Sequence, residues 1–302
     1  MDDTRTSTLS LLALAHAELL PALSFTDLCA LLPISHTRNT RRTEVASLLA
    51  QLEKEVVVMS RDNWYALSKT PDIPMLKKRL SISQAKLARN RVFFFLMQAI
   101  PFLEGAVITG SVSMGSAHEK SDIDIFCIIK KGRIWTARIC LLFLAELFGS
   151  RREKKHLLDK LCFNCFIAHT AVFPLQNIAS AHMLARAIPL FGTTPLEAFF
   201  TANAWTELYV SRPPHTPLVR PSRSLRAISL VVAWLLSGSV GNTLERTVAR
   251  WQIHRLRSKA TRGGGNASGL ILHEDIVTLY YPDSKNNTVM ARYADAIKQI
   301  DF

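Results

Sequence analysis

Residues 108–129 read ITGSVSMGSAHEKSDIDIFCII, and this stretch decides how the rest of the chain is interpreted. It predicts a strand that ends at Gly110-Ser111, a short helix after that turn, a polar loop, and a second strand with two aspartates. Because side chains at i and i+2 of a strand point to one face, Asp122 and Asp124 converge while Ile123 and Ile125 pack into the core. Two carboxylates on one rigid face can share a divalent cation.

The two aspartates are predicted to bind Mg²⁺, or Mn²⁺ in its place. Like charges held this close repel each other, and a cation between them removes the repulsion. Mg²⁺ prefers hard oxygen ligands and combines one or two protein carboxylates with phosphate oxygens and water. At Gly110-Ser111, small residues let backbone N–H groups approach phosphate oxygens. The alternative is an ordinary hairpin with a solvated Asp-x-Asp edge.

This segment resembles the signature of the nucleotidyltransferase superfamily related to DNA polymerase β, over residues 108–129. The resemblance implies a mixed α/β (α+β) nucleotidyltransferase core. By position it implies that Gly110, Ser111 and Ser121 bind the nucleotide, and that Asp122 and Asp124 form the catalytic metal site. The implied reaction moves a nucleoside monophosphate from a nucleoside triphosphate such as ATP to a hydroxyl acceptor, with pyrophosphate leaving.

The family usually has a third carboxylate on a later strand, and this chain departs from that pattern. The best candidate strand is 160–168, with Asn164 in its middle and Asp159 and His169 at its flanks. An amide oxygen binds a metal weakly and cannot act as a base near neutral pH. With Asn164 as the third metal ligand, two interpretations stay open: an enzyme that works by positioning and charge neutralisation, or a catalytically impaired nucleotide sensor or regulator.

The composition favours a globular protein with a polyanionic partner. The chain has 302 residues, 48% of them hydrophobic, and 37 Lys and Arg against 24 Asp and Glu give a formal charge of +13. Such basicity suits RNA, DNA or a membrane surface, and RNA is the expected acceptor, with a toxin or defence component that modifies tRNA as one variant. A protein side chain or a small molecule is the alternative acceptor.

A cytoplasmic protein without a membrane partner is expected. The chain begins Met1-Asp2-Asp3, with no basic leader before an apolar segment. The most apolar runs, at 139–148 and 228–236, are too short to span a bilayer. Five cysteines without regular spacing are expected to be reduced.

Residues 1–70 are predicted to form a winged-helix-like domain. Three helices, at 8–20, 24–32 and 40–54, precede a hairpin over 56–67, and Ser24 followed by Asp27 indicates a capped helix start. In DNA-binding winged helices the third helix enters the major groove. Here its start carries the basic residues His36, Arg38, Arg41 and Arg42. The alternatives are protein contacts or a scaffold role.

The nucleotidyltransferase core is predicted over 83–195, after a linker at 68–82 that contains Pro71 and Pro74. Its other predicted elements are helices at 83–100, 134–147 and 178–187, a last strand at 171–175 and a basic loop at 151–156.

A helical C-terminal domain is predicted over 196–302. Within it, helical spacing places four basic residues on one face, where they suit a phosphate backbone: Arg246, Arg250, His254 and Arg257. A solvated helix face is the alternative.

Overall fold

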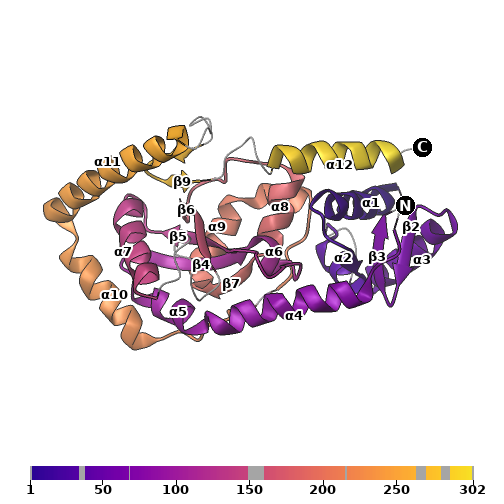
Figure 1. Ribbon diagram of the computed structural model, residues 1–302, viewed down its shortest axis with the longest axis horizontal. Coiled ribbons are helices and arrows are strands. Elements are labelled where there is room, and N and C mark those ends of the chain that lie inside the picture. The colour runs from indigo at the N-terminus through magenta and orange to yellow at the C-terminus, as the bar shows by residue number, and fades with distance from the viewer. Residues whose placement is uncertain are drawn as a thin grey trace.

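The structure is a computed structural model, and it describes residues 2–33, 38–67, 69–148, 160–214, 216–262, 270–279 and 286–300. The described residues form a mixed α/β protein with two sheets, one of three strands and one of six. Figure 1 shows the smaller sheet at one end of an elongated molecule and the larger sheet in its middle. The predicted mixed α/β class is confirmed at this level.

The N-terminal part combines three helices with the smaller sheet. Its elements are α1 (Asp2–Ala17), β1 (Leu23–Ser24), α2 (Phe25–Leu31), α3 (Arg38–Lys54), β2 (Val58–Arg61) and β3 (Trp64–Leu67), with strand order β1-β3-β2. Three helices followed by a hairpin were predicted, and all are present. The predicted cap is also present, since Ser24 Oγ accepts a hydrogen bond from Asp27 N at 3.0 Å. Two residues that tolerate positive φ, Asp62 and Asn63, form the hairpin turn.

Most of the predicted linker at 68–82 is helical, which corrects the expectation of turns around Pro71 and Pro74. Helix α4 (Ile73–Arg89) begins well before the predicted start at 83 and is followed by α5 (Arg91–Leu96) and the 3₁₀ turn η1 (Met97–Ala99). Asp72 caps α4 by accepting a hydrogen bond from Met75 N at 3.1 Å, and Pro74 lies in the first turn. A proline is tolerated there because its missing N–H would have had no partner.

The larger sheet is the core of the molecule. Its strands, in spatial order, are β7 (Ile188–Phe191), β4 (Leu103–Thr109), β5 (Ile123–Ile129), β6 (Leu161–Ala168), β9 (Ile276–Thr278) and β8 (Ile271–Leu272). Strand β5 is antiparallel to β4 and parallel to β6. One sheet face packs on α5 and α7 (Ile134–Leu147), and the other packs on α8 (Ile178–Ala185) and α9 (Thr193–Ala202).

The strand predicted at 171–175 is also wrong. These residues form a loop in which Phe173 N donates to the side chain of Asn203 at 2.6 Å, and Pro174 has no N–H for a strand ladder. The edge strand next to β4 is β7 instead. The predicted strand at 160–168 and the helix at 134–147 are confirmed as β6 and α7.

The region from 196 onward is mostly helical, as predicted, and also supplies two strands to the larger sheet. It contains α9, the 3₁₀ helix η2 (Ala204–Leu208), α10 (Arg223–Leu235), α11 (Gly238–Arg262), β8, β9 and α12 (Asn286–Ile300). Figure 1 shows α11 above α7 and α12 along α1. Among the described residues, no single helix is long and apolar enough to cross a membrane.

Candidate functional site

The Gly-Ser turn lies directly against one of the predicted metal ligands. Strand β4 ends at Thr109, which pairs with Asp124 across the ladder, and the short helix α6 (Gly110–Ser113) follows without a break. Gly110 has φ +71°, and a Cβ at this position would overlap the Asp124 carboxylate. Only glycine fits both requirements. The local sequence therefore brings the Asp124 carboxylate against the backbone of the turn.

The alternation predicted for β5 is confirmed. Ile123 and Ile125 are fully buried, whereas Asp124 is half-buried. Asp124 is on the same side of the strand as Phe126 and Ile128, which pack on α8 and α9. Asp122 directly precedes β5 and is also half-buried. Both carboxylates thus lie at the start of β5, next to the Gly110 turn that ends β4.

Asn164 joins this corner from the neighbouring strand, in agreement with its predicted position. Its Nδ2 donates to Asp124 Oδ1 at 2.6 Å. The register between β5 and β6 shifts here: Ile125 pairs with Phe163 and Phe126 pairs with Cys165, so Asn164 is the extra residue of a bulge. Bulges redirect side chains, and at this bulge the Asn164 side chain contacts Asp124 on the neighbouring strand.

The side chains at this corner offer oxygen ligands of the kind that a magnesium ion prefers. Asn164 Oδ1 is buried without a hydrogen-bond partner, which leaves an acceptor unused beside a carboxylate. Turning the amide would exchange Oδ1 and Nδ2, and a cation shared with Asp124 would favour that orientation. The described residues contain no group of three or more His, Cys, Asp or Glu arranged to hold a metal. Phosphate oxygens and water would therefore complete the coordination, as is usual for Mg²⁺.

Two residues of α4, missed by the sequence analysis, hold the loop between the two halves of the motif. Ala117 N donates to Ser83 Oγ at 3.2 Å, and Lys86 Nζ donates to the Glu119 carbonyl at 3.1 Å. Lys86 is 1% exposed, and lysine is rarely buried to this extent. Both residues lie within the helix predicted at 83–100, and their i, i+3 spacing places them on one face, but the sequence does not show that the loop at 117–119 packs there.

The two serines of the predicted site take part in this loop. Ser111 is half-buried, and its carbonyl accepts a hydrogen bond from Ser116 N at 2.9 Å. Ser121 Oγ accepts from His118 N at 3.0 Å, which closes the turn just before Asp122. Both serines therefore shape the backbone around the two aspartates.

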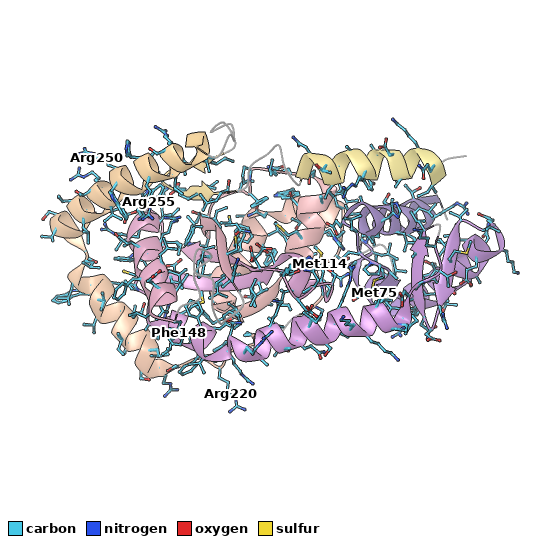
Figure 2. The ribbon with its side chains drawn as sticks, in the orientation of Figure 1. Met75, Met114, Phe148, Arg220, Arg250 and Arg255 are labelled. Carbon is cyan, nitrogen blue, oxygen red and sulfur yellow. The ribbon has the colours of Figure 1, made fainter. Side chains whose placement is uncertain are left out.

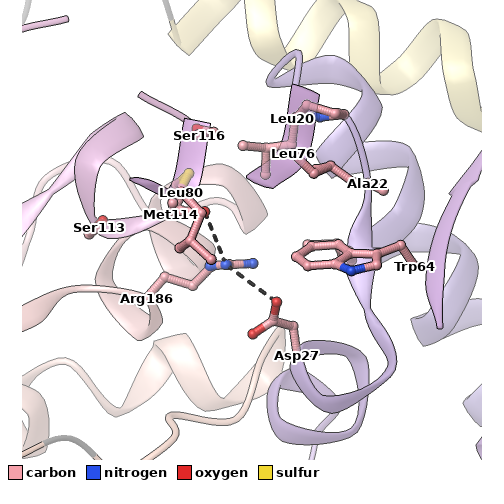
Figure 3. A pocket seen from close by; sticks show the side chains of 13 residues that line it. Leu20, Ala22, Asp27, Trp64, Leu76, Leu80, Ser113, Met114, Ser116 and Arg186 are labelled. Atoms are coloured by element: carbon pink, nitrogen blue, oxygen red, sulfur yellow. Dashed lines mark hydrogen bonds and ion pairs between the residues drawn. The ribbon is translucent and has the colours of Figure 1, made fainter. Parts of the chain in front are cut away.

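A pocket of about 270 Å³ opens where α6 meets the N-terminal part (Figure 3). Ser113, Met114 and Ser116 line one side, and Trp64 lies across from Arg186 and Asp27. Arg186 donates to the Met114 carbonyl at 3.4 Å and forms an ion pair with Asp27 at 3.6 Å. Its Nη1 is buried without a hydrogen-bond partner. A cationic group therefore borders a cavity beside the residues that follow the Gly-Ser turn.

One of the two alternatives to Asn164 lies far from the site. His169 Nδ1 is 2.8 Å from Glu104 Oε2, near the first residue of β4, whereas Gly110 follows the last. Asp159 and the basic loop 151–156 lie outside the described residues.

The predicted basic surfaces are described in part. On α3, Arg42 is exposed and its guanidinium lies over the Phe25 ring, whereas His36 and the side chains of Arg38 and Arg41 lie outside the described residues. On α11, every member of the predicted basic face is exposed: Arg246, Arg250, His254 and Arg257. Figure 2 shows Arg250 pointing away from the body of the protein.

Comparisons with known protein families, with curated proteins and with solved structures find no match to this chain. The interpretation of the site therefore depends on the geometry around Asp124.

Burial raises the pKa of the Cys127 and Cys165 thiols above the usual value of a cysteine, so neither offers a thiolate as a nucleophile or ligand at neutral pH.

Proposed function

We propose that this protein is a nucleotidyltransferase that moves a nucleoside monophosphate from a nucleoside triphosphate to a hydroxyl acceptor. One observation carries the proposal: the Asp124 carboxylate touches both the Gly110 turn and the Asn164 amide. A phosphate-binding turn and a carboxylate pair must be adjacent for metal-assisted phosphoryl transfer, because a divalent ion held by the carboxylates would neutralise the charge of a phosphate bound at the turn. The polymerase-β-like signature in the sequence points to the same chemistry.

In this proposal each residue of the corner has a distinct role. Asp122 and Asp124 would hold Mg²⁺ or Mn²⁺. Asn164 donates to Asp124 when no metal is bound, and would turn its amide oxygen to the metal as a neutral third ligand. The backbone at Gly110 and Ser111 binds triphosphate oxygens, with Ser121 fixing the loop that follows. When bound, the metal supplies neutralisation of the negative charge that develops on the leaving pyrophosphate. Within the part of the chain that the structure describes, no third carboxylate joins this corner, so positioning and charge neutralisation would account for most of the rate.

The pocket beside α6 is the proposed place for the part of the substrate that extends beyond the turn. Arg186 lines the pocket and offers a cationic side chain to an anionic or carbonyl oxygen there, and Trp64 offers an aromatic face to a planar group. The ion pair with Asp27 holds the guanidinium in place.

RNA, tRNA included, is the proposed acceptor, in the cytoplasm. The formal charge of +13 and the polymer phosphates are complementary. The N-terminal part, which we interpret as winged-helix-like, is the proposed site of nucleic-acid binding. Exposed Arg42 on α3 supports this role.

A second candidate function is a nucleotide sensor or regulator that binds DNA through the N-terminal part. The neutral Asn164 beside Asp124 favours it, because the usual third carboxylate is replaced. A sensor would bind nucleotide and metal at the same corner without forming a product.

Incubation with each α-labelled nucleoside triphosphate, Mg²⁺ or Mn²⁺, and total RNA tests the proposal. The wild type should label RNA, and Asp124→Asn should not. The matched control is Asp295→Asn, which removes an exposed carboxylate on α12 and should label as the wild type does. Equal labelling by Asp124→Asn would overturn the site assignment, and metal-dependent nucleotide binding without product would favour the sensor.

A further inference from the structure

Helix α10 has its apolar side in solvent. The side towards the protein includes polar groups that bond to the loop before β4: Ser229 Oγ donates to the Ile100 carbonyl at 2.9 Å, and Arg226 Nη1 donates to the Leu103 carbonyl at 3.0 Å. The outward side carries large hydrophobic side chains, with Trp234 75% exposed. A surface helix of a globular protein normally has the opposite arrangement.

The outward apolar side continues from α10 onto α11. Its exposed members are Ile228, Leu230, Val231, Trp234, Leu235, Val240, Leu244 and Trp251, which we call the apolar ridge. Residues 227–244 contain no charged side chain. Large exposed apolar side chains gathered over two consecutive helices in this way mark an interaction site.

The corner between the two helices is fixed by the sequence. The axes of α10 and α11 differ by 94°. Gly238 has φ +74°, a conformation that favours glycine, and a Cβ at Gly241 would overlap the Leu236 carbonyl, so only glycine fits at 241. The apolar ridge is therefore held in one bent shape.

Cationic groups flank the apolar ridge, and no anionic group is exposed near it in the sequence. Between 223 and 258 the only acidic residue is Glu245, which is buried and bonded to the start of α7. The exposed basic residues beside the ridge are Arg220, Arg223, Arg246, Arg250, His254, Arg255 and Arg257. Figure 2 shows Arg220, just before α10, and Arg250, midway along α11, pointing outward.

We propose that the apolar ridge and its arginines dock this protein on the surface of an anionic phospholipid bilayer. Apolar side chains, tryptophan among them, enter the boundary between headgroups and acyl chains, while flanking arginines contact lipid phosphates. The helices lie on the surface and do not cross the bilayer, because Ser229 and Glu245 attach their other sides to the protein. This inference is independent of the proposed transfer reaction, and it revises the expectation from sequence of no membrane partner.

The surroundings of the ridge favour lipid over a second copy of the chain. A second copy would bring the same arginines to the contact and add like charge, whereas anionic headgroups neutralise them. Nucleic acid would bind the arginines but leaves Trp234, Val231 and Leu235 in contact with water.

Vesicle flotation with the full chain tests the proposal. Vesicles of phosphatidylcholine alone are compared with vesicles that also contain phosphatidylglycerol. The wild type should float with the anionic vesicles only. The double variant Val231→Ser/Trp234→Ser should bind at least about 10-fold more weakly, because the inserted area is lost. Arg250→Gln/Arg257→Gln should bind about 25-fold more weakly, at about 5-fold for each arginine near the surface.

Two controls separate this surface from nonspecific adhesion. Leu208→Ser removes an exposed leucine on η2, and Arg292→Gln/Lys298→Gln removes two exposed cations on α12. Both should float as the wild type does, and all variants should keep the wild-type melting temperature. Equal flotation with neutral vesicles, or undiminished flotation of the Val231→Ser/Trp234→Ser variant, would overturn the proposal.

Two further outcomes would assign the surface to another occupant. A dimer in light scattering that Val231→Ser/Trp234→Ser dissociates would identify a second copy. RNA binding lost in Arg250→Gln/Arg257→Gln while flotation persists would identify nucleic acid. Either result contradicts lipid docking by these residues.

Discussion

This molecule has one carboxylate that accepts hydrogen bonds at Asp124 and another at Glu245. The two sites differ in how many of their buried polar atoms have a hydrogen-bond partner. Glu245 of α11 accepts hydrogen bonds from Trp135 N and Thr136 N, both at 2.8 Å, and from the Thr136 hydroxyl. At the other corner, Asp124 accepts from Asn164 Nδ2, but Asn164 Oδ1 is buried without a partner.

The difference separates a structural carboxylate from a functional one. Glu245 uses the free N–H groups at the start of α7, where negative charge is favourable, and so attaches α11 to the core. The Asp124 corner leaves an acceptor unused, which lowers stability and suits a ligand. Substitution of Glu245 should therefore reduce stability, and substitution of Asp124 should reduce activity.

The largest effect is expected for Asp122→Asn and Asp124→Asn. Each should reduce transfer by about 10³-fold or more, because metal neutralisation of the transition state contributes several kcal/mol. The melting temperature without metal should stay equal or rise, since repulsion between the carboxylates is relieved. Initial rates and thermal melts check both statements. Wild-type turnover in either variant would contradict these roles.

Glu245→Gln should give the opposite pattern. The free energy of unfolding should fall by about 2–3 kcal/mol. The NH₂ group of the new amide would face a backbone N–H group of α7, and the hydrogen bonds to a charged carboxylate would be lost. Transfer per folded molecule should be unchanged. Urea unfolding measures the first quantity, with Glu197→Gln, at an exposed site on α9, as the control. If the control loses as much stability, the α7 cap is not responsible.

Gly110→Ala and Gly132→Ala form a matched pair. Both glycines have φ near +70°, but a Cβ at Gly132 meets nothing within 4 Å, whereas one at Gly110 overlaps Asp124. Gly132→Ala should therefore lower stability by about 1–2 kcal/mol through backbone strain alone. Gly110→Ala should lower it further and also abolish transfer. Equal activity in the two variants would show that the close approach to Asp124 is unimportant.

The smallest effect is expected for Asn164→Asp. A third carboxylate beside Asp124 should lower the melting temperature without metal and raise it with Mg²⁺, with metal affinity increased about 10-fold, or about 1.4 kcal/mol. Turnover should rise where the new carboxylate can take the acceptor proton. Melting curves with and without Mg²⁺ measure the effect. A lower melting temperature with unchanged metal affinity would exclude Asn164 from the metal site.

Local rules account for the features that were predicted correctly. The burial of Ile123 and Ile125 follows from strand parity, and the Ser24 cap and α7 follow from short-range patterns. The resemblance also assigned Asp124 and Asn164 to one site, and the structure brings these two side chains into contact.

The early start of α4 was missed although its signals, the Asp72 cap and Pro74, are local. Three other missed features depend on contacts between distant segments. The bulge at Asn164 is visible only in the register with β5, and the roles of Ser83 and Lys86 require the loop at 117–121. The region that contains α10 was predicted to be helical, but the spacing of its apolar residues does not show which side of the helix faces the protein. Its inverted orientation depends on the Ile100 and Leu103 carbonyls.

Mn²⁺ binding tests whether the corner at Asp124 is a metal–triphosphate site. Bound Mn²⁺ is measured as the decrease of the paramagnetic resonance signal of the free ion, with and without a non-hydrolysable nucleoside triphosphate. The wild type and Asp295→Asn should bind Mn²⁺ more tightly when the nucleotide is present, because phosphate oxygens complete the coordination. Asp122→Asn and Asp124→Asn should lose most of this nucleotide-dependent binding. If the two variants bind Mn²⁺ and nucleotide as tightly as the wild type, the corner at Asp124 is not a metal–triphosphate site.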